Sequence, residues 1–316
     1  MKAIKEKLPD TREEWLAQRA RGLGGSDAGA VMGVNKYKSA YTLWAEKTGI
    51  LPAPDIDNEA MRQGRDLENY VAQRFVEETG KRVKRSNFCY TAIDHPHMRA
   101  NIDRLIVGEN AGLECKTANL FADADYQEGQ IPQSYYCQCL HYMATLGLDR
   151  MYLACLVLGR NFHVFTIDIA DPGVAEDMAA LVAAEEEFWQ LVKDGTPPQI
   201  DGSDSTTDTL KSLYPQSAQD NTADLNAFED LFSQREDLQK EKKRIDELLS
   251  AIENQVREEL KDAEKGLSRG WSVSFKTQQR VTIDSKKLKA ERPDVAEIYS
   301  KKITSRPLTI KKRKGA

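Results

Sequence analysis

Apolar residues recur at spacings of three and four in several segments of the first 200 residues, as they do on one face of a helix. The pattern predicts helices in "TREEWLAQRA" (11–20), "AYTLWAEKTG" (40–49) and "EAMRQGRDLENYVAQRFVEETG" (59–80). The first begins with a threonine that has glutamate three positions later, a capping box, and the other two stop at a glycine. Further helices are expected at 131–147 and 172–193.

Shorter apolar runs between these helices have the length and composition of strands. We expect strands at 82–91, 101–107, 112–117, 151–158 and 162–168. The order is a helical lead-in, an antiparallel meander, a helix and further strands. It predicts an α/β fold with a central mixed β-sheet flanked by helices.

The composition changes after the first 200 residues, which indicates more than one folded unit. A stretch rich in Pro, Gly, Ser, Thr and Asp is followed by apolar positions at close to 3.5 spacing within a charged segment: Leu225, Phe228, Phe232, Leu238, Ile245, Leu249, Ile252 and Val256. This spacing predicts a long helix resembling a coiled coil. We therefore expect four parts: a folded domain at 1–198, a linker at 199–223, the long helix at 224–265 and a C-terminal extension with a short β-hairpin and a basic tail at 266–316.

Charge and hydropathy exclude some classes of protein. No apolar run approaches the roughly 18 to 20 residues of a membrane span, and the N-terminus lacks the apolar middle of a secretory signal, so we expect a cytoplasmic protein without membrane contact. The net charge of -5 does not indicate a nucleic-acid binder. The last sixteen residues nevertheless carry seven basic residues and no acid: Lys301, Lys302, Arg306, Lys311, Lys312, Arg313 and Lys314. This tail is either a solvated end or a contact for nucleic acid or a partner.

The cysteine content argues against a disulfide framework. Five cysteines, an odd number, lie mostly in apolar segments, as reduced thiols of a cytosolic core do. No CxxC pair is present and the four histidines are scattered, so the spacing predicts neither a zinc nor an iron–sulfur site.

Candidate chemistry begins in "NIDRLIVGENAGLECKT" (101–117), which places Asp103 and Glu114 on facing strands of one hairpin. Side chains alternate along a strand, so Lys116 shares the face of Glu114 while Cys115 points away. Two carboxylates and a backbone carbonyl are hard ligands suited to Mg²⁺ or Mn²⁺, and the lysine can stabilise a phosphate or act on an attacking water. Taken alone, the hairpin is a surface element with a salt bridge as readily as many others, and this is the ordinary alternative.

Two residues outside the hairpin extend this hypothesis. Glu68, on the helix at 59–80, could bring a third carboxylate to the metal. Gln138 lies on an otherwise apolar helix face, in "YYCQCLHYM". An exposed helical glutamate and a hydrogen-bonded helix glutamine are the ordinary alternatives.

A candidate anion site lies near the N-terminus, in "WLAQRARGLGGSDAGAVMG" (15–33). Trp15, Arg19 and Arg21 precede a Gly-Gly-Ser-Asp turn that includes Ser26. Arginine can bind a phosphate in a bidentate manner, and a serine hydroxyl can complete the pocket. The alternative is an ordinary helix cap beside surface arginines.

Four motifs resemble one family when they are taken in order: "WLAQRARGLGGSDAGAVMG", "QGRDLENYV", "NIDRLI" with "GLECKT", and "YYCQCLHYM". Their order and spacing are similar to those of the YqaJ-like viral recombinases, relatives of phage lambda exonuclease in the PD-(D/E)XK nuclease superfamily. The resemblance covers about residues 10–195 and implies that the first domain is a PD-(D/E)XK exonuclease domain with the restriction-endonuclease-like core.

The resemblance implies roles for the candidate residues. Asp103, Glu114, the main-chain carbonyl of Cys115 and Glu68 would form the metal site, Lys116 would act on the nucleophilic water, and Gln138 would help to hold the centre. Arg19 and Ser26 would contact a terminal 5′-phosphate, with Trp15 and Arg21 beside them. The family often has proline before the first aspartate, where this chain has Ile102, and lambda exonuclease has serine where this chain has Asn101.

The activity implied by the resemblance is Mg²⁺-dependent degradation of linear double-stranded DNA from 5′ to 3′, with Mn²⁺ able to substitute. The product would be a 3′ single strand for a single-strand annealing protein, in a bacterial host cell, from a phage or prophage. Some relatives form a homo-oligomer, a trimer that encircles DNA. Two alternatives remain open: a structure-specific endonuclease or single-strand nuclease on the same fold, and a non-catalytic DNA-binding or scaffold relative.

Overall fold

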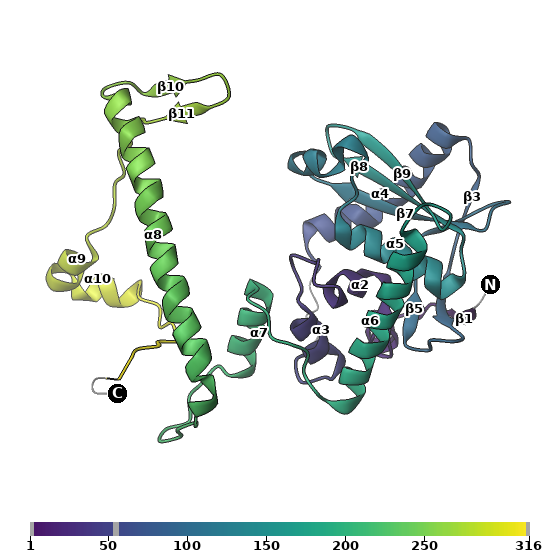
Figure 1. Cartoon of the computed structure of the whole chain (residues 1–316), viewed down its shortest axis with the longest axis horizontal. Coiled ribbons are helices and arrows are strands. Elements are labelled where there is room, and N and C mark those ends of the chain that lie inside the picture. The colour runs from purple at the N-terminus through teal and green to yellow at the C-terminus, as the bar shows by residue number, and fades with distance from the viewer. Residues whose placement is uncertain (1–2, 53–56, 314–316) are drawn as a thin grey trace. The chain divides into compact units, whose positions relative to one another are not determined.

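The computed structural model describes residues 3–52 and 57–313, so Lys314 of the basic tail lies outside the described residues. The chain divides into two compact units, Met1–Pro215 and Gln216–Ala316 (Figure 1). The elements of the first unit are β1 (Ala3–Lys7), α1 (Arg12–Ala20), β2 (Leu23–Gly24), α2 (Gly25–Val31), α3 (Ala40–Lys47), α4 (Glu59–Thr79), β3 (Val83–Arg85), β4 (Phe88–Ala92), β5 (Met98–Ala100), β6 (Arg104–Ile106), β7 (Ala111–Ala118), η1 (Leu120–Gly129), α5 (Gln133–Leu146), β8 (Arg150–Val157), β9 (Phe162–Asp168), α6 (Val174–Asp194) and α7 (Asp204–Leu213).

Two predicted helix ends are confirmed in this unit, the start of α1 at Thr11 and the stop of α4 at Gly80, whereas α3 ends at Lys47 with Thr48 as its cap, before the glycine that was expected to stop it. Thr11 caps α1, its hydroxyl accepting a hydrogen bond from the backbone N–H of Glu14 at 3.2 Å. Helices α4 and α5 end at Gly80 and Gly147, which have φ of 68° and 66°, a left-handed conformation that costs glycine little.

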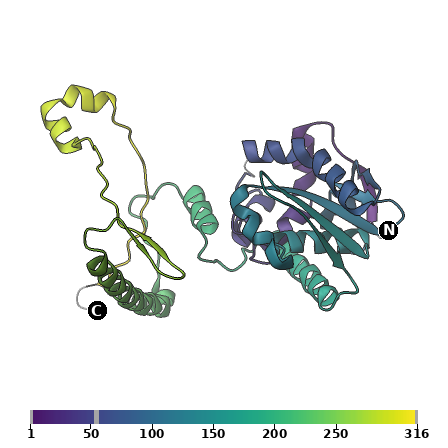
Figure 2. The ribbon, with the colours of Figure 1, turned by 90° about the horizontal axis from the view of Figure 1, so that it is seen from above.

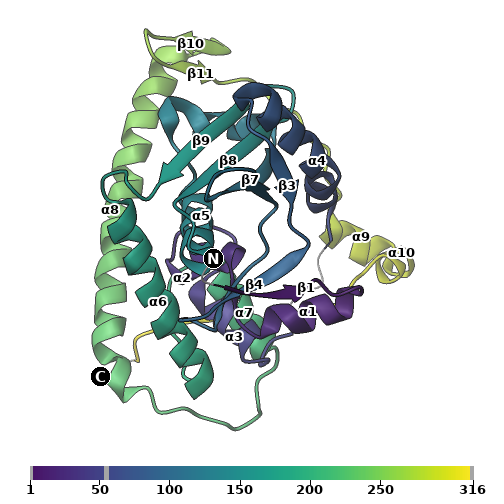
Figure 3. The same cartoon turned by 90° about the vertical axis from the view of Figure 1, so that its right-hand side faces the viewer.

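The central sheet has five strands in the order β3-β6-β7-β8-β9. Only β7 and β8 are parallel, and α5 makes the crossover between them, whereas the other neighbours are antiparallel. Figure 2 shows this sheet between helices, and Figure 3 shows its strands beside α4, α5 and α6. The predicted mixed sheet flanked by helices is confirmed.

The alternation of side chains along β7 and β8 divides the core into two layers. Phe75 of α4 packs with Leu113 and Tyr152 on one face of the sheet. On the other face, residues of α5 such as Leu140 pack with Leu153. Burial of each large apolar side chain contributes about 2 kcal/mol. The chain thus holds α5 against the face of β7 that carries Glu114 and Lys116.

The expected single strand at 82–91 is wrong. The chain breaks at Ser86 and Asn87, so that β3 joins the central sheet while β4 joins a second sheet with the order β1-β4-β5-β2. The break lies at the end of a polar run, residues 84–87, which leaves no apolar face to continue one strand.

The expected linker at 199–223 contains helix α7, which packs against α3 within the first unit. Hydroxyl groups make this contact: Thr42 Oγ1 lies 2.8 Å from Ser205 Oγ and 2.8 Å from Thr209 Oγ1, and Thr206 donates to Ser39 Oγ at 2.8 Å. The Ser/Thr-rich composition that suggested a flexible linker therefore forms a buried polar contact.

The second unit contains η2 (Asn226–Phe228), the long helix α8 (Glu229–Leu260), the hairpin of β10 (Lys265–Leu267) and β11 (Ser272–Ser274), and helices α9 (Ser285–Glu291) and α10 (Pro293–Ile298). The predicted C-terminal helical and short β extension is confirmed. The apolar stripe of α8, including Leu238 and Ile252, is exposed within its unit. Among the described residues, no helix has the length and apolar character to cross a membrane.

Candidate metal centre and anion pocket

The pairing of β6 with β7 brings Asp103 to Glu114. Arg104 lies opposite Leu113 in the antiparallel register, so the preceding Asp103 lies beside the following Glu114. The backbone N–H of Cys115 donates to Asp103 Oδ2 at 2.8 Å, which fixes the aspartate immediately before β6. The hairpin geometry predicted from the sequence is confirmed.

Glu114 is buried, with 4% of its surface exposed, and its two oxygens have different surroundings. Oε1 accepts from Gln138 Nε2 at 2.6 Å and lies 2.8 Å from Lys116 Nζ. Oε2 is buried without a partner among the described residues. A buried carboxylate oxygen without a donor is costly, and a cation is the group that would satisfy it.

Gln138 joins the sheet to α5. Its Oε1 accepts from Lys116 Nζ at 2.9 Å, and its Nε2 also donates to the hydroxyl of Tyr142 at 2.9 Å. Tyr142, one helical turn later, donates to the carbonyl of Asn101 at 3.2 Å. Both amide atoms of Gln138 are hydrogen-bonded, as in an ordinary helix glutamine. Two of its partners are the candidate residues Glu114 and Lys116, however, so Gln138 holds them in position.

The ionisation of the centre reflects its burial and crowding. Burial, followed by the charge of Glu114, raises the pKa of Asp103 well above its usual range. Burial disfavours the charged form of Lys116, but the adjacent Glu114 carboxylate outweighs it and raises the pKa of the lysine. Two close carboxylates that repel one another are typical of a site for a divalent cation.

Cys115 lies on the opposite side of β7. Burial, with Asp103 and Glu114 nearby, raises the pKa of its thiol, so the thiol stays protonated and is a poor ligand. We therefore predict that Cys115 would bind a metal ion through its main-chain carbonyl.

Glu68 of α4 lies at the same cavity as Asp103. The cavity has a volume of about 130 Å³, and Glu68, Asn101, Ile102 and Asp103 all line it. Arg104 Nη1 donates to Glu68 Oε1 at 2.5 Å and to the Asp103 carbonyl at 2.7 Å. The charges of Glu114 and Glu68 both act on Asp103, so the structure brings together the three predicted carboxylates, and Arg104 joins the Glu68 carboxylate to the Asp103 main chain.

Ile102, at the position where the resemblance implied proline, is part of the core. Its side chain is 2% exposed, and its Cδ1 lies 2.2 Å from the position that a Cβ on Gly112 would occupy. Ile102 therefore fills the space that Gly112 leaves, and the pair fixes the hairpin next to Asp103.

The predicted anion site forms a separate cavity of about 180 Å³, lined by residues that include Trp15, Arg19 and Ser26. Arg19 Nη2 donates to Ser26 Oγ at 3.0 Å, and its guanidinium lies 4.9 Å from the ring centre of Trp15. Arg21 is exposed and lies outside the lining of this cavity, so its DNA contact stays a prediction. Arg99, which donates to Glu6 Oε2 at 2.6 Å, lines it instead.

A buried ion pair supports this cavity from behind. Asp27, 3% exposed, lies 2.9 Å from Lys47 Nζ and accepts from the N–H of Gly24 at 3.0 Å. Burial opposes ionisation, but Lys47 and Arg19 together lower the pKa of Asp27 to about 2. The carboxylate therefore stays charged and holds Arg19 in place.

Gly25 allows the anion pocket to approach the metal centre. A Cβ there would lie 2.6 Å from Tyr142 Cε1 and 3.1 Å from Gln138 Cγ. Gln138, Tyr142 and Asn101 all line the anion pocket as well. Asn101 lines both cavities, and its Oδ1 is buried without a partner among the described residues.

Sequence reasoning missed several of these residues. Arg99 and Arg104 lie on short strands, where an arginine reads as exposed, yet both are buried by ion pairs with glutamates from distant elements. Tyr142 could have been found, because it follows Gln138 by four positions on the same helix face.

A family model described as the YqaJ-like viral recombinase domain matches residues 14–149. "Uncharacterized protein YqaJ" of Bacillus subtilis (strain 168) is 36% identical over 310 residues, which cover 95% of this chain and 94% of that protein. The chain belongs to the YqaJ family. The family resemblance predicted from the four motifs is therefore confirmed, and because the similarity to the Bacillus YqaJ protein spans both units, the second unit is shared as well.

Two solved structures are similar to this YqaJ family member. An alkaline exonuclease (LHK-Exo) from Laribacter hongkongensis is 22% identical with a TM-score of 0.48, over 57% of this chain and 94% of that chain. A phage related exonuclease from Haemophilus somnus 129PT is 12% identical with a TM-score of 0.41, over 55% of this chain and 96% of that chain.

Proposed function

We propose that the chain is a metal-dependent DNA exonuclease that degrades one strand of linear double-stranded DNA from 5′ to 3′. The observation that carries the proposal is the buried, unpartnered Oε2 of Glu114 beside Asp103, Lys116 and Gln138. Membership of the YqaJ-like viral recombinase family supports a role in DNA recombination.

The donor set fits Mg²⁺ or Mn²⁺. Asp103, Glu114 and Glu68 offer only carboxylate oxygens, and the carbonyl of Cys115 would add another hard ligand. A bound ion would polarise the scissile phosphate and lower the pKa of a water molecule. The orphaned Oε2 and the mutual repulsion of Asp103 and Glu114 are what such an ion would relieve.

The remaining side chains would position the substrate and the water. Lys116, held between Glu114 Oε1 and Gln138 Oε1, would present its ammonium group to a phosphate or an attacking water. Gln138 would hold Lys116 and Glu114 in position, because its Oε1 accepts from Lys116 and its Nε2 donates to Glu114.

End recognition would take place in the anion pocket. Arg19 and Ser26 offer a guanidinium and a hydroxyl in one cavity, and a terminal 5′-phosphate has the charge and geometry to bind them. The carboxylates lie beyond the shared wall of Asn101 and Gln138, so a chain held by its end would lead towards them. This arrangement supports release of mononucleotides from a 5′ end.

The 3′ single strand left behind would serve a single-strand annealing protein. We include a homo-oligomer in the proposal, because the exposed apolar stripe of α8 is the kind of surface that a second copy covers. The basic tail, described as far as Arg313, would add affinity for the DNA backbone.

The deciding experiment uses linear duplex labelled at each 5′ end or internally, compared with a covalently closed circle, in Mg²⁺ and in chelator. We expect mononucleotide release from linear duplex only, and its loss in Asp103→Asn and Lys116→Ala. Lys243→Ala and Asp246→Asn are matched controls, because both residues form only surface ion pairs on α8. Equal cutting of the circle would instead indicate an endonuclease, and full activity of both centre variants would refute the site.

A further inference from the structure

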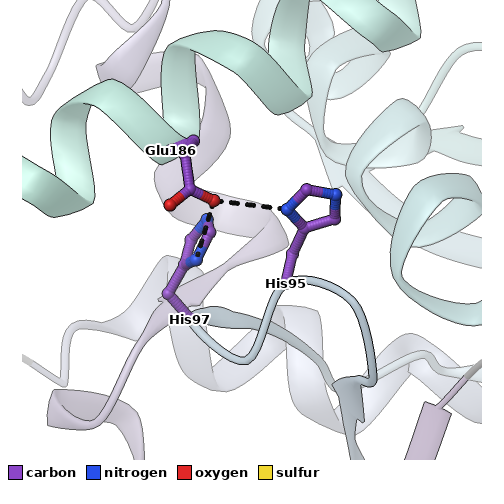
Figure 4. Close-up of side chains that lie close together, drawn as sticks. All are labelled: His95, His97 and Glu186. Carbon is purple, nitrogen blue, oxygen red and sulfur yellow. Dashed lines mark hydrogen bonds and ion pairs between the residues drawn. The ribbon is translucent and has the colours of Figure 1, made fainter.

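Two histidines and a glutamate meet outside the carboxylate centre. His95 and His97 lie in the loop between β4 and β5, and Glu186 reaches them from α6 (Figure 4). His95 Nδ1 lies 3.2 Å and His97 Nδ1 3.6 Å from the same oxygen, Glu186 Oε2. One ligand atom from each residue lies within 4.8 Å of the others.

His97 is the buried member of this cluster and is poorly satisfied by the protein. It is 5% exposed, and its Nε2 has no hydrogen-bond partner among the described residues. The 3.6 Å from its Nδ1 to Glu186 is longer than a hydrogen bond. The ring stacks on Trp189 at a centroid distance of 6.2 Å and an interplanar angle of 15°, so packing aims Nδ1 at the carboxylate.

Two of the three separations are close to the edge of a tetrahedral site. Ligands about 2.0 to 2.2 Å from Zn²⁺ lie roughly 3.3 to 3.6 Å apart when the coordination is tetrahedral. The two imidazole nitrogens lie 3.2 and 3.6 Å from Glu186 Oε2, and all three ligand atoms lie within 4.8 Å of one another.

We propose that His95, His97 and Glu186 bind one Zn²⁺, with a water molecule as fourth ligand. Two imidazoles and one carboxylate form a borderline donor set that suits zinc, in contrast to the all-oxygen set of the carboxylate centre. His95 and Glu186 are both partly exposed, which leaves a route for the ion and room for the water.

The bound ion would brace the wall of the anion pocket. The carbonyl of His97 accepts from the N–H of Leu23 at 2.6 Å, and a Cβ on Gly22 would lie 2.4 Å from that carbonyl. Zinc would tie this loop to α6 and so limit movement of the segment that leads to Ser26. The role is structural, and it does not depend on nuclease activity.

The test adds zinc chloride to the full-length, chelator-treated protein in excess Mg²⁺ and measures binding by calorimetry and by competition with a chromophoric chelator. We expect one zinc per chain, an increase in melting temperature, and a rise in Kd of about tenfold or more in Glu186→Gln and His95→Ala. His163→Ala is the matched control, because His163 forms a simple pair with Asp123 at 3.1 Å. Asp103→Asn should still bind this zinc.

X-ray absorption separates a built site from loosely held ions. The wild-type protein should show nitrogen and oxygen ligands at about 2.0 to 2.2 Å with two imidazoles. The proposal is overturned if the wild-type protein binds no zinc, if Glu186→Gln and His95→Ala bind it as the His163→Ala control does, or if the bound zinc is lost in Asp103→Asn. Glu186 is half exposed, so the glutamine variant should fold, and its melting temperature without zinc verifies this.

Discussion

Substitution of Gly25 by alanine should uncouple the anion pocket from the carboxylate centre. The new Cβ would lie 2.6 Å from Tyr142 Cε1, where ordinary contacts begin at 3.4 Å, so the ring must move by roughly 0.8 Å. Tyr142 bonds Gln138, which holds Glu114 and Lys116. A shift of this size would therefore reach both residues.

The expected magnitude follows from that chain of contacts. Misplacement of reacting groups by about 1 Å costs on the order of 100-fold in rate. Overpacking a tight contact costs about 1 to 3 kcal/mol of stability. We expect Gly25→Ala to fold with a lower melting temperature and to release mononucleotides from 5′-phosphorylated duplex roughly 100-fold more slowly.

The matched control is Gly64→Ala on helix α4. A Cβ there meets only Thr117 Oγ1, at 3.7 Å, so it fits, and alanine in a helix adds up to about 1 kcal/mol of stability. Initial rates under saturating Mg²⁺ and thermal unfolding are measured for both variants. If Gly25→Ala has the rate and melting temperature of the wild-type protein, the contact between Gly25 of α2 and Tyr142 of α5 does not position the carboxylate centre, and the prediction is refuted.

Three further predictions concern the pocket and the domain boundary. Arg19→Ala should reduce the preference for a 5′-phosphate over a 5′-hydroxyl by roughly tenfold or more, since a charge-assisted bond is lost. Arg21→Ala should leave this preference unchanged. If rate assays show equal effects of the two substitutions, the phosphate does not bind in the cavity beside Arg19. Asp27→Asn should lower the free energy of unfolding at pH 7 by about 3 kcal/mol, because a buried ammonium loses its partner. The pKa of Asp27 falls from 3.8 to about 2 on folding, so its contribution is complete above pH 3.8 and disappears towards pH 2, and the gap between urea unfolding curves should close over that interval. A chain cut after residue 215 should unfold at a higher temperature than one cut after 198, which loses α7; identical melting temperatures would contradict the α3 contact.

The hairpin was predictable because its information is local. Alternation along β7 and a short turn suffice to place Asp103 against Glu114 and to turn Lys116 to the same face. Gln138 was predictable as a polar residue on an apolar helix face. Its partners were not, because they depend on which face of the sheet α5 covers, and that is decided by long-range packing.

Other features depended on tertiary contacts that leave little trace in the sequence. Arg104 is buried against Glu68 and Asn69 of α4. Helix α7 is held by the hydroxyl groups of α3 and by the packing of Leu210 and Leu213 on the cluster that contains α3 residues. The cluster of His95, His97 and Glu186 joins positions about 90 residues apart. In the sequence, the two histidines on either side of Pro96 do not match a known metal-binding spacing, and the glutamate that completes the cluster is too distant to be recognised.

Asn101 has a further consequence, because it lines both cavities. A larger residue at this position would intrude on both of them. A substitution at this position should therefore affect both the proposed phosphate pocket and the proposed metal centre. Within the family, a change confined to one of the two cavities should therefore occur at residues that line one cavity alone, such as Arg19 or Glu68.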